Sequence, residues 1–137
     1  MKKSYILNLN EIDTVVDEIL SHIKNGVVLL KGDLASGKTT LVKAVAKKLG
    51  CEDDVTSPTF SLQQCYGQNI FHYDIYNHGF EHFISLGMAE ELEKDGLHFV
   101  EWADDELKEF LDSVGIEFLE IDIKKLENKR EYTICTH

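Results

Sequence analysis

The sequence predicts an α/β fold in which one layer of mixed β-sheet carries helices on its faces. Three observations predict it. Residues 27–30 form a short apolar run between turn residues, as expected of a strand buried on both faces of a parallel sheet. Apolar residues recur at helical spacing through residues 12–23. Residues 116–123 and 131–135 alternate and are joined by a polar turn, which is typical of an antiparallel hairpin. The length of 137 residues, 43% of them hydrophobic, predicts a single domain over residues 1–137.

The first half of the chain is expected to run strand, helix, strand, helix. Residues 4–9 alternate loosely and predict a first strand. Asn10 is the expected N-cap of the first helix, with Asp13 as a weak capping-box partner. After the strand at 27–30 and a glycine-containing turn, a second amphipathic helix is expected to run to residue 49, with Gly50 as its C-terminal stop.

The second half is expected to return to strands separated by helices. The predicted strands are 59–66, 69–74, 97–100, 116–123 and 131–135. The predicted helices are 81–92, which carries a glycine at position 87, and 103–111.

Acidic residues are distributed unevenly. The chain has 14 Lys and Arg against 25 Asp and Glu, and residues 74–120 hold fourteen acidic residues and two lysines. This stretch repels phosphate backbones, so direct nucleic-acid binding by this half is not expected. A solvated surface is the simple interpretation, and a docking face for a basic partner is the alternative.

Apolar runs and cysteines predict the compartment. The longest apolar run, at 27–30, is too short to span a membrane, and the apolar residues after Lys3 are too few for a signal-peptide core. Cys51, Cys65 and Cys135 are odd in number and lack C-x-x-C spacing, so we expect reduced thiols with no disulfide partner. The prediction is a soluble, cytoplasmic protein.

A phosphate-binding loop follows the buried strand. It matches G-x-x-x-x-G-K-[ST] without a gap in Gly32, Asp33, Leu34, Ala35, Ser36, Gly37, Lys38 and Thr39. Backbone N–H groups of the loop and the start of the following helix would converge on phosphate oxygens. Lys38 would add a charge at the β- and γ-phosphates, and the Thr39 hydroxyl would bind Mg²⁺. The sequence therefore predicts a nucleotide site.

An acidic residue is needed across the sheet to complete the metal site. Asp74 and Glu101 each end a strand-like run, so both would stand at the carboxyl edge of the sheet, where open α/β sheets gather ligands. The residues alone leave open which of the two contacts the metal. His72 is open between a packed strand histidine and a neighbour of the nucleotide.

Two further positions are candidates for contact with the nucleotide. Thr59 lies about twenty residues past the loop, where nucleotide switches carry a threonine that senses the γ-phosphate. Glu11 is a candidate for approaching the base, because the first helix leads into the strand beside the loop.

These motifs together resemble a known family. The resemblance is carried by the loop with its second threonine Thr40, the block Ser57-Pro58-Thr59-Phe60, the block His72-x-Asp74-x-Tyr76, and Glu101-Trp102. Over residues 4–135 the chain resembles the TsaE family, the small bacterial ATPases needed to make threonylcarbamoyladenosine in tRNA.

The resemblance implies a P-loop NTPase fold with a partly antiparallel sheet, and ATP with Mg²⁺ as ligands. It also implies work with the TsaB and TsaD proteins, which carry the transfer itself, so that tRNA is reached only through the complex. It assigns the metal to Thr39 and Glu101 and places Asp74 and Trp102 in the functional set.

The chain departs from the family pattern at two positions. Ala35 stands where glycine is usual, so a left-handed backbone there would be strained. Asn77 stands where the His-x-Asp-x-Tyr block usually ends in arginine, which removes the charge contact of that arginine.

Two other functions remain alternatives to an ATPase subunit. A small-molecule kinase shares the loop, but kinases generally surround the transferred phosphate with several arginines, and Arg130 is the only arginine here. A nucleotide-gated binding module would hold ATP with little turnover. Arg130 is expected in the closing hairpin turn, away from the phosphates, so hydrolysis is expected to be slow until a partner supplies a cation.

Overall fold

The computed structural model describes residues 2–32, 37–51, 63–66, 69–75, 79–103 and 105–136. Its described strands are β1 (Lys2–Leu7), β2 (Gly26–Lys31), β3 (Gln63–Tyr66), β4 (Ile70–Asp74), β5 (Leu97–Glu101), β6 (Phe118–Lys125) and β7 (Arg130–Thr136). Its described helices are the 3₁₀ helix η1 (Leu9–Glu11), α1 (Asp13–His22), α2 (Lys38–Lys48), α3 (Gly79–Ser85), α4 (Met88–Glu91) and α5 (Asp105–Val114).

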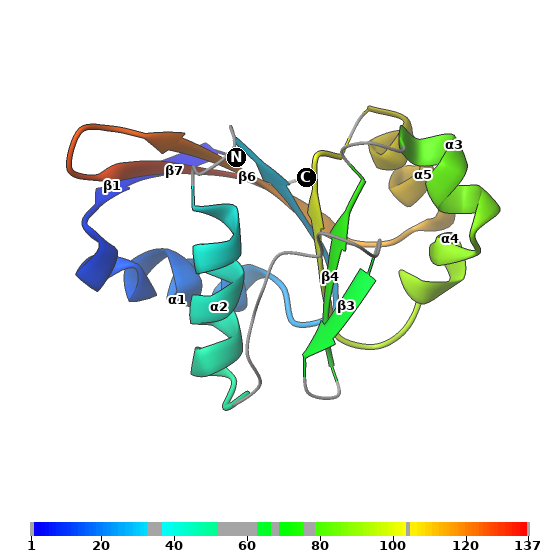
Figure 1. Ribbon diagram of the computed structural model, residues 1–137, viewed down its shortest axis with the longest axis horizontal. Helices are drawn as coiled ribbons and strands as arrows, with labels where there is room; N and C mark the ends of the chain where they lie inside the picture. Colours follow the sequence, from blue (N-terminus) through cyan, green and yellow to red (C-terminus); the bar gives the residue numbers. More distant parts are fainter. Residues whose placement is uncertain are drawn as a thin grey trace.

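The described strands form one seven-stranded sheet in the order β1-β7-β6-β2-β5-β4-β3 (Figure 1). Strands β6, β2, β5 and β4 are parallel, whereas the β1–β7, β6–β7 and β3–β4 pairs are antiparallel. The predicted mixed α/β fold is therefore confirmed. Because β5 is inserted between β2 and β4, the ends of these three parallel strands stand side by side, with Glu101 paired to Leu30 on one side and Asp74 on the other.

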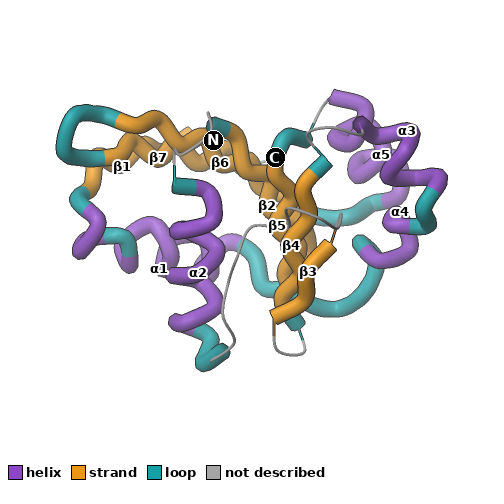
Figure 2. Tube along the Cα trace, in the orientation of Figure 1, coloured by secondary structure: helices purple, strands orange, loops and turns teal. Residues whose placement is uncertain are grey.

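Helices cover both faces of this sheet, α1 and α2 on one and α3, α4 and α5 on the other (Figure 2). Strand β2 serves both cores: Val28 and Leu30 pack with the α1 and α2 side, and Val27 and Leu29 pack with the α3 to α5 side. All four side chains are fully buried, which confirms the prediction of a two-sided buried strand.

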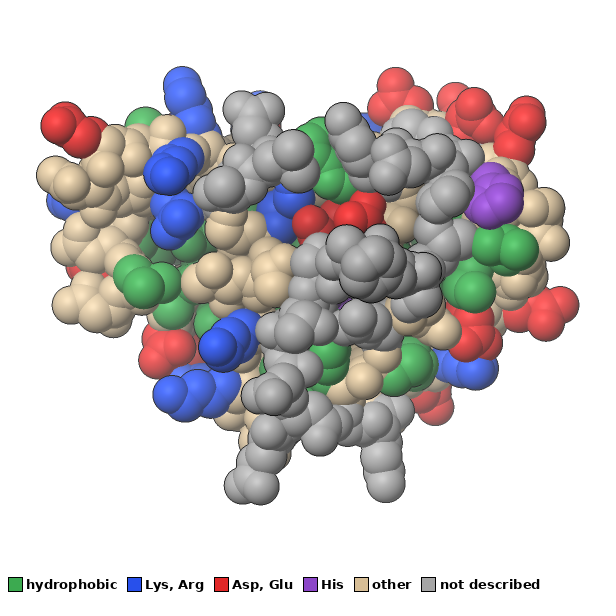
Figure 3. Space-filling view, viewed as in Figure 1, with side chains coloured by type: hydrophobic (Ala, Val, Ile, Leu, Met, Phe, Trp, Pro, Cys, Tyr) green, Lys and Arg blue, Asp and Glu red, His purple; other side chains and the backbone are tan. Residues whose placement is uncertain are grey.

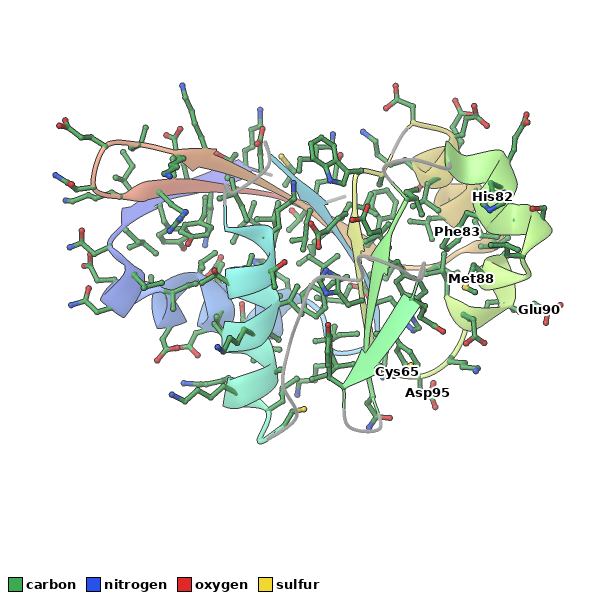
Figure 4. All side chains as sticks on the ribbon, viewed as in Figure 1. Cys65, His82, Phe83, Met88, Glu90 and Asp95 are labelled. Atoms are coloured by element: carbon green, nitrogen blue, oxygen red, sulfur yellow. The ribbon has the colours of Figure 1, made fainter. Side chains whose placement is uncertain are left out.

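The helices on the α3 to α5 side pack on the sheet through apolar side chains. Phe83 and Met88 point from α3 and α4 toward the sheet, whereas Glu90 points away from it (Figure 4). The Phe83 ring meets Tyr73 of β4 edge-on at a centroid separation of 5.8 Å. On the visible face of the molecule, acidic side chains gather over this side and most lysines over the α1 and α2 side (Figure 3).

Several predicted boundaries are wrong, for local reasons. The first helix is not capped by Asn10 with Asp13: the chain first forms η1, in which the Asn8 backbone N–H donates to Glu11 Oε1 at 2.9 Å. The helix predicted over 81–92 is two helices, because Gly87 adopts a left-handed φ of 77° between them. The closing hairpin is confirmed as β6 and β7.

Three smaller findings complete the description. Within the described ranges, no helix is long and apolar enough to cross a membrane. Cys51, Cys65 and Cys135 are free thiols. Residues 59–62 of the strand predicted over 59–66 lie outside the described residues, and the remainder is β3.

Candidate functional site

The start of α2 holds Lys38 in a fixed position. Gly37 precedes the helix with a φ of 109°, and Gly32 at the other end of the loop has a φ of 146°; both values favour glycine. The Lys38 side chain is buried, and its Nζ donates to the Gly32 carbonyl oxygen at 2.6 Å. The ammonium group is therefore held across the loop that it is predicted to serve.

Trp102 covers the same ammonium group. Its ring centroid lies 3.9 Å from Lys38 Nζ, which is cation–π geometry. Trp102 follows directly after β5 and has a φ of 64°, the one positive φ at a non-glycine residue in the described ranges. A left-handed conformation at a bulky residue costs free energy and persists only where its surroundings demand it. The conformation that places this ring over Lys38 therefore lowers the stability of the fold.

The two candidate acidic residues are brought together by the parallel pairing of β4 and β5. Asp74 and Glu101 are register partners at the ends of these strands, and the Ile75 N–H donates to the Glu101 carbonyl oxygen at 3.3 Å. Glu101 is buried and Asp74 is half-buried. A short hydrogen bond joins Glu101 Oε2 to His72 Nε2, and His72 is fully buried. His72 is thus a packed strand histidine that also contacts a site residue.

The structure places Arg130, a further functional candidate, differently from the prediction made from the sequence. It is the first residue of β7, and its side chain lies against the phosphate loop. A Cβ built at Gly37 would stand 2.8 Å from Arg130 Nε and 3.0 Å from its Cδ, so the lack of a side chain at Gly37 lets Arg130 lie this close. The expectation that Arg130 lies away from the phosphates is therefore wrong. A hairpin places residues by register, and the register of β7 against β1 and β6 brings this residue to the loop.

The Arg130 guanidinium is also incompletely paired. Its Nε is buried and has no hydrogen-bond partner among the described residues. Buried donors are nearly always paired, so an unpaired one beside a phosphate-loop motif points to an anionic ligand.

A pocket of about 190 Å³ adjoins Arg130 at the end of the closing hairpin. It lies between the η1 region and the β6–β7 turn and is lined by Leu7, Leu9, Lys125, Leu126, Glu127, Asn128, Lys129, Arg130 and Tyr132. Leucine and tyrosine side chains supply apolar surface, and the turn supplies polar groups. Glu11 ends η1 but does not line this pocket; its carboxylate accepts the Asn8 N–H, and its side chain is exposed.

Lys31, directly before the loop, is engaged elsewhere. Its Nζ pairs with Glu120 Oε1 at 2.8 Å, and Lys108 joins the same oxygen at 2.9 Å. The hydrogen bond to Glu120 raises the pKa of Lys108 above its ordinary value. These residues form a separate ion cluster, and the described cations that face the loop are Lys38 and Arg130.

Thr39 and Thr40 occupy the first turn of α2 and are half-buried. Of the other predicted site residues, Asp33, Leu34, Ala35, Ser36 and Thr59 lie outside the described residues. Within the described ranges, no three His, Cys, Asp or Glu side chains converge as a metal centre. The two carboxylates instead fit a magnesium site of the kind completed by a hydroxyl, phosphate oxygens and water.

A family model for "Threonylcarbamoyl adenosine biosynthesis protein TsaE" matches residues 6–132. The chain belongs to the TsaE family. It is 33% identical to the tRNA threonylcarbamoyladenosine biosynthesis protein TsaE of Treponema pallidum over 128 residues, which cover 89% of each chain. It is 35% identical to the TsaE protein of Rickettsia prowazekii, covering 77% of this chain and 74% of that one.

A solved structure agrees with the family assignment. The crystal structure of Bacillus subtilis YdiB superposes with a TM-score of 0.68 at 26% identity, covering 99% of this chain and 86% of that chain. The resemblance to the TsaE family that the sequence motifs indicated is thus confirmed, and so is the P-loop NTPase fold.

Proposed function

We propose that this TsaE-family chain is an ATPase of tRNA threonylcarbamoyladenosine biosynthesis, that it binds Mg-ATP, and that it acts in the cytoplasm. One arrangement carries the proposal. Lys38 and Arg130 stand on the loop side of the site, and Asp74 and Glu101, which are register partners, end the neighbouring strands. Cations beside a loop of backbone N–H groups suit phosphates, and carboxylates suit the counter-cation of those phosphates.

Each group has a separate task in this proposal. Lys38 neutralises the β- and γ-phosphates, and the unpaired Nε of Arg130 offers a donor to the phosphate chain or the ribose beside it. The pocket between η1 and the β6–β7 turn, of about 190 Å³, receives the nucleoside, and Glu11 of η1 is the proposed contact to the base. Asp33 to Ser36, Thr40 and Thr59 complete the nucleotide contacts, and Trp102 fixes the position of Lys38.

Thr39 and Glu101 would hold Mg²⁺, with Asp74 as the neighbouring catalytic acid. When bound, the ion neutralises charge that develops on the phosphate oxygens during transfer. Glu101 suits this task because it is buried at the end of β5 and its carboxylate is already oriented by a hydrogen bond.

Glu101→Gln tests the metal assignment. We expect the variant to fold, to retain ATP binding in the absence of metal, and to lose Mg²⁺-dependent hydrolysis, because an amide does not balance the cation as a carboxylate does. Phosphate release and calorimetry measure the two properties. Normal hydrolysis by Glu101→Gln together with loss in Asp74→Asn would reverse the roles of the two acids.

The second part of the proposal concerns partners. We infer that TsaB and TsaD stimulate hydrolysis and that tRNA is reached only through that complex. The acidic side chains over α3 to α5 offer a face for a basic partner surface (Figure 3). The test is steady-state ATPase activity with and without the TsaB–TsaD pair at low and high salt. Fast turnover by the isolated protein that the pair leaves unchanged would contradict the proposal and favour a small-molecule kinase.

A nucleotide-gated binding module is the other alternative, and the same assay separates it. Such a module would bind ATP tightly and release almost no phosphate even with the pair present.

A further inference from the structure

A buried row of hydrogen bonds runs across three neighbouring strands to the candidate metal ligand. Tyr66 of β3 places its hydroxyl 3.3 Å from His72 Nδ1, and His72 of β4 places its Nε2 against Glu101 Oε2 of β5. Tyr66, His72 and Glu101 are all buried, and His72 is not exposed at all. None of these bonds can be exchanged for water without opening the sheet face.

The chemistry of the partners sets the direction of the row. An ionised carboxylate only accepts, so His72 Nε2–H donates to Glu101 Oε2. In the tautomer of His72 that donates from Nε2, Nδ1 is an acceptor, and the Tyr66 O–H is placed to donate to it. Tyr66 therefore selects the one tautomer of His72 that can hold the carboxylate.

We propose that His72 is the positioning residue for the Glu101 carboxylate and that Tyr66 fixes its tautomer. The inference rests on the proposed function in taking Glu101 as the Mg²⁺ ligand. A hydrogen bond to Oε2 restricts the rotation of the carboxylate, so that Oε1 would be held in one orientation for binding a cation. Groups that orient metal ligands in this way typically contribute about 10- to 100-fold to metal affinity.

The fold contains a matched control on the opposite face of the sheet. His98 of β5 is equally buried, and its Nδ1 accepts from the Tyr73 hydroxyl at 2.7 Å. Its Nε2–H donates to the Lys94 carbonyl oxygen at 2.8 Å. The two histidines thus share burial and a tyrosine partner, and they differ in whether the third group is a backbone carbonyl or Glu101.

The experiment measures metal affinity separately from activity. Mn²⁺ is titrated into the protein loaded with a non-hydrolysable ATP analogue, bound metal is counted by electron paramagnetic resonance, and analogue affinity is measured in chelator. For His72→Leu we expect Mn²⁺ affinity to fall by about 10- to 100-fold with little change in metal-free nucleotide affinity. For His98→Leu we expect lower stability and unchanged Mn²⁺ affinity. His72→Gln keeps an N–H that reaches Glu101 and should recover most of the affinity.

Four outcomes would overturn the inference. An equal effect of His72→Leu and His98→Leu would show a structural role only. A further loss on adding His72→Leu to Glu101→Gln would show that His72 does not act through Glu101. Unchanged Mn²⁺ affinity in Glu101→Gln would overturn the metal assignment and this inference with it. Lower Mn²⁺ affinity in Glu101→Gln but unchanged affinity in His72→Leu would overturn this inference alone.

A second comparison keeps the test decisive if His72→Leu does not fold. His72→Gln and His72→Asn are both polar, but only the longer glutamine reaches the Glu101 carboxylate. Tighter Mn²⁺ binding by His72→Gln supports the positioning role, and equal binding overturns it. Tyr66→Phe removes the donor to Nδ1 and should weaken Mn²⁺ binding in the same direction by a smaller factor; no weakening overturns the assigned tautomer.

Discussion

Truncation of Arg130 should lower ATP affinity without lowering stability. The guanidinium lies against Gly37, and its buried Nε has no hydrogen-bond partner among the described residues. An unsatisfied buried donor costs about 1–3 kcal/mol, which offsets the packing that Arg130→Ala removes. We therefore expect the free energy of unfolding in the absence of nucleotide to stay within about 1 kcal/mol of the original value, or to rise.

The affinity for ATP should change much more. A hydrogen bond between a guanidinium and a phosphate contributes about 1.5–3 kcal/mol, which corresponds to about 10- to 150-fold in the dissociation constant. Isothermal calorimetry with ATP measures the affinity, and denaturant unfolding measures the stability. Arg130→Lys keeps the charge without the planar fork, so its ATP affinity should lie between that of the original protein and that of Arg130→Ala.

Lys124→Ala is the control, because Lys124 is an exposed cation of the same hairpin that does not line the pocket beside Arg130. It should leave ATP affinity nearly unchanged. Wild-type affinity in Arg130→Ala would refute the reasoning. So would a fall in kcat of about 10³-fold or more at unchanged affinity, since that result would move Arg130 from binding to the hydrolytic step.

Two further predictions concern Lys38 and His98. Lys38→Ala should weaken ATP binding by orders of magnitude, because Gly32 and Trp102 hold the ammonium group across the loop. Calorimetry on the folded variant measures the ATP affinity, and an unchanged affinity would overturn the assignment of the phosphate-binding loop. Burial lowers the pKa of His98 in the folded chain. Below about pH 6.5 the unfolded chain therefore binds a proton at His98 that the folded chain does not, and the free energy of unfolding falls by up to about 1 kcal/mol toward pH 5.5. Denaturant unfolding at pH 7.5 and 5.5 should show a smaller fall in His98→Gln, and an equal fall would contradict the role of His98.

Local patterns were sufficient for the elements that a short stretch of chain determines. The run at 27–30 and the closing hairpin were predicted because burial on two faces and alternation are properties of a few consecutive residues. The sequence shows Gly87 within the predicted helix but does not show that the helix breaks there. Glycine within a helix is only weakly unfavourable, and the packing of Phe83 and Met88 decides whether the helix breaks.

The contacts of the site depend on strand order and register, which periodicity does not specify. Glu101 and Asp74 were both expected at the carboxyl edge of the sheet, but only the insertion of β5 between β2 and β4 makes them neighbours. The same insertion brings His72 to Glu101. Arg130 was misplaced for this reason: it was expected in the hairpin turn but begins β7, and its approach to Gly37 follows from long-range pairing.

The departures from ordinary packing rules support the proposed site independently of the phosphate-loop motif. The other positive φ values in the described ranges fall on glycines, where they cost little, whereas Trp102 adopts one at a bulky residue. Arg130 leaves a buried nitrogen unpaired. Glu101 is a buried acid held by a histidine rather than by a lysine or arginine. Each feature lowers stability on its own, and all of them meet around the start of α2 and the end of β5. Selection for stability alone would remove them, so their gathering at one edge of the sheet is best explained by a ligand that carries both phosphate and a cation.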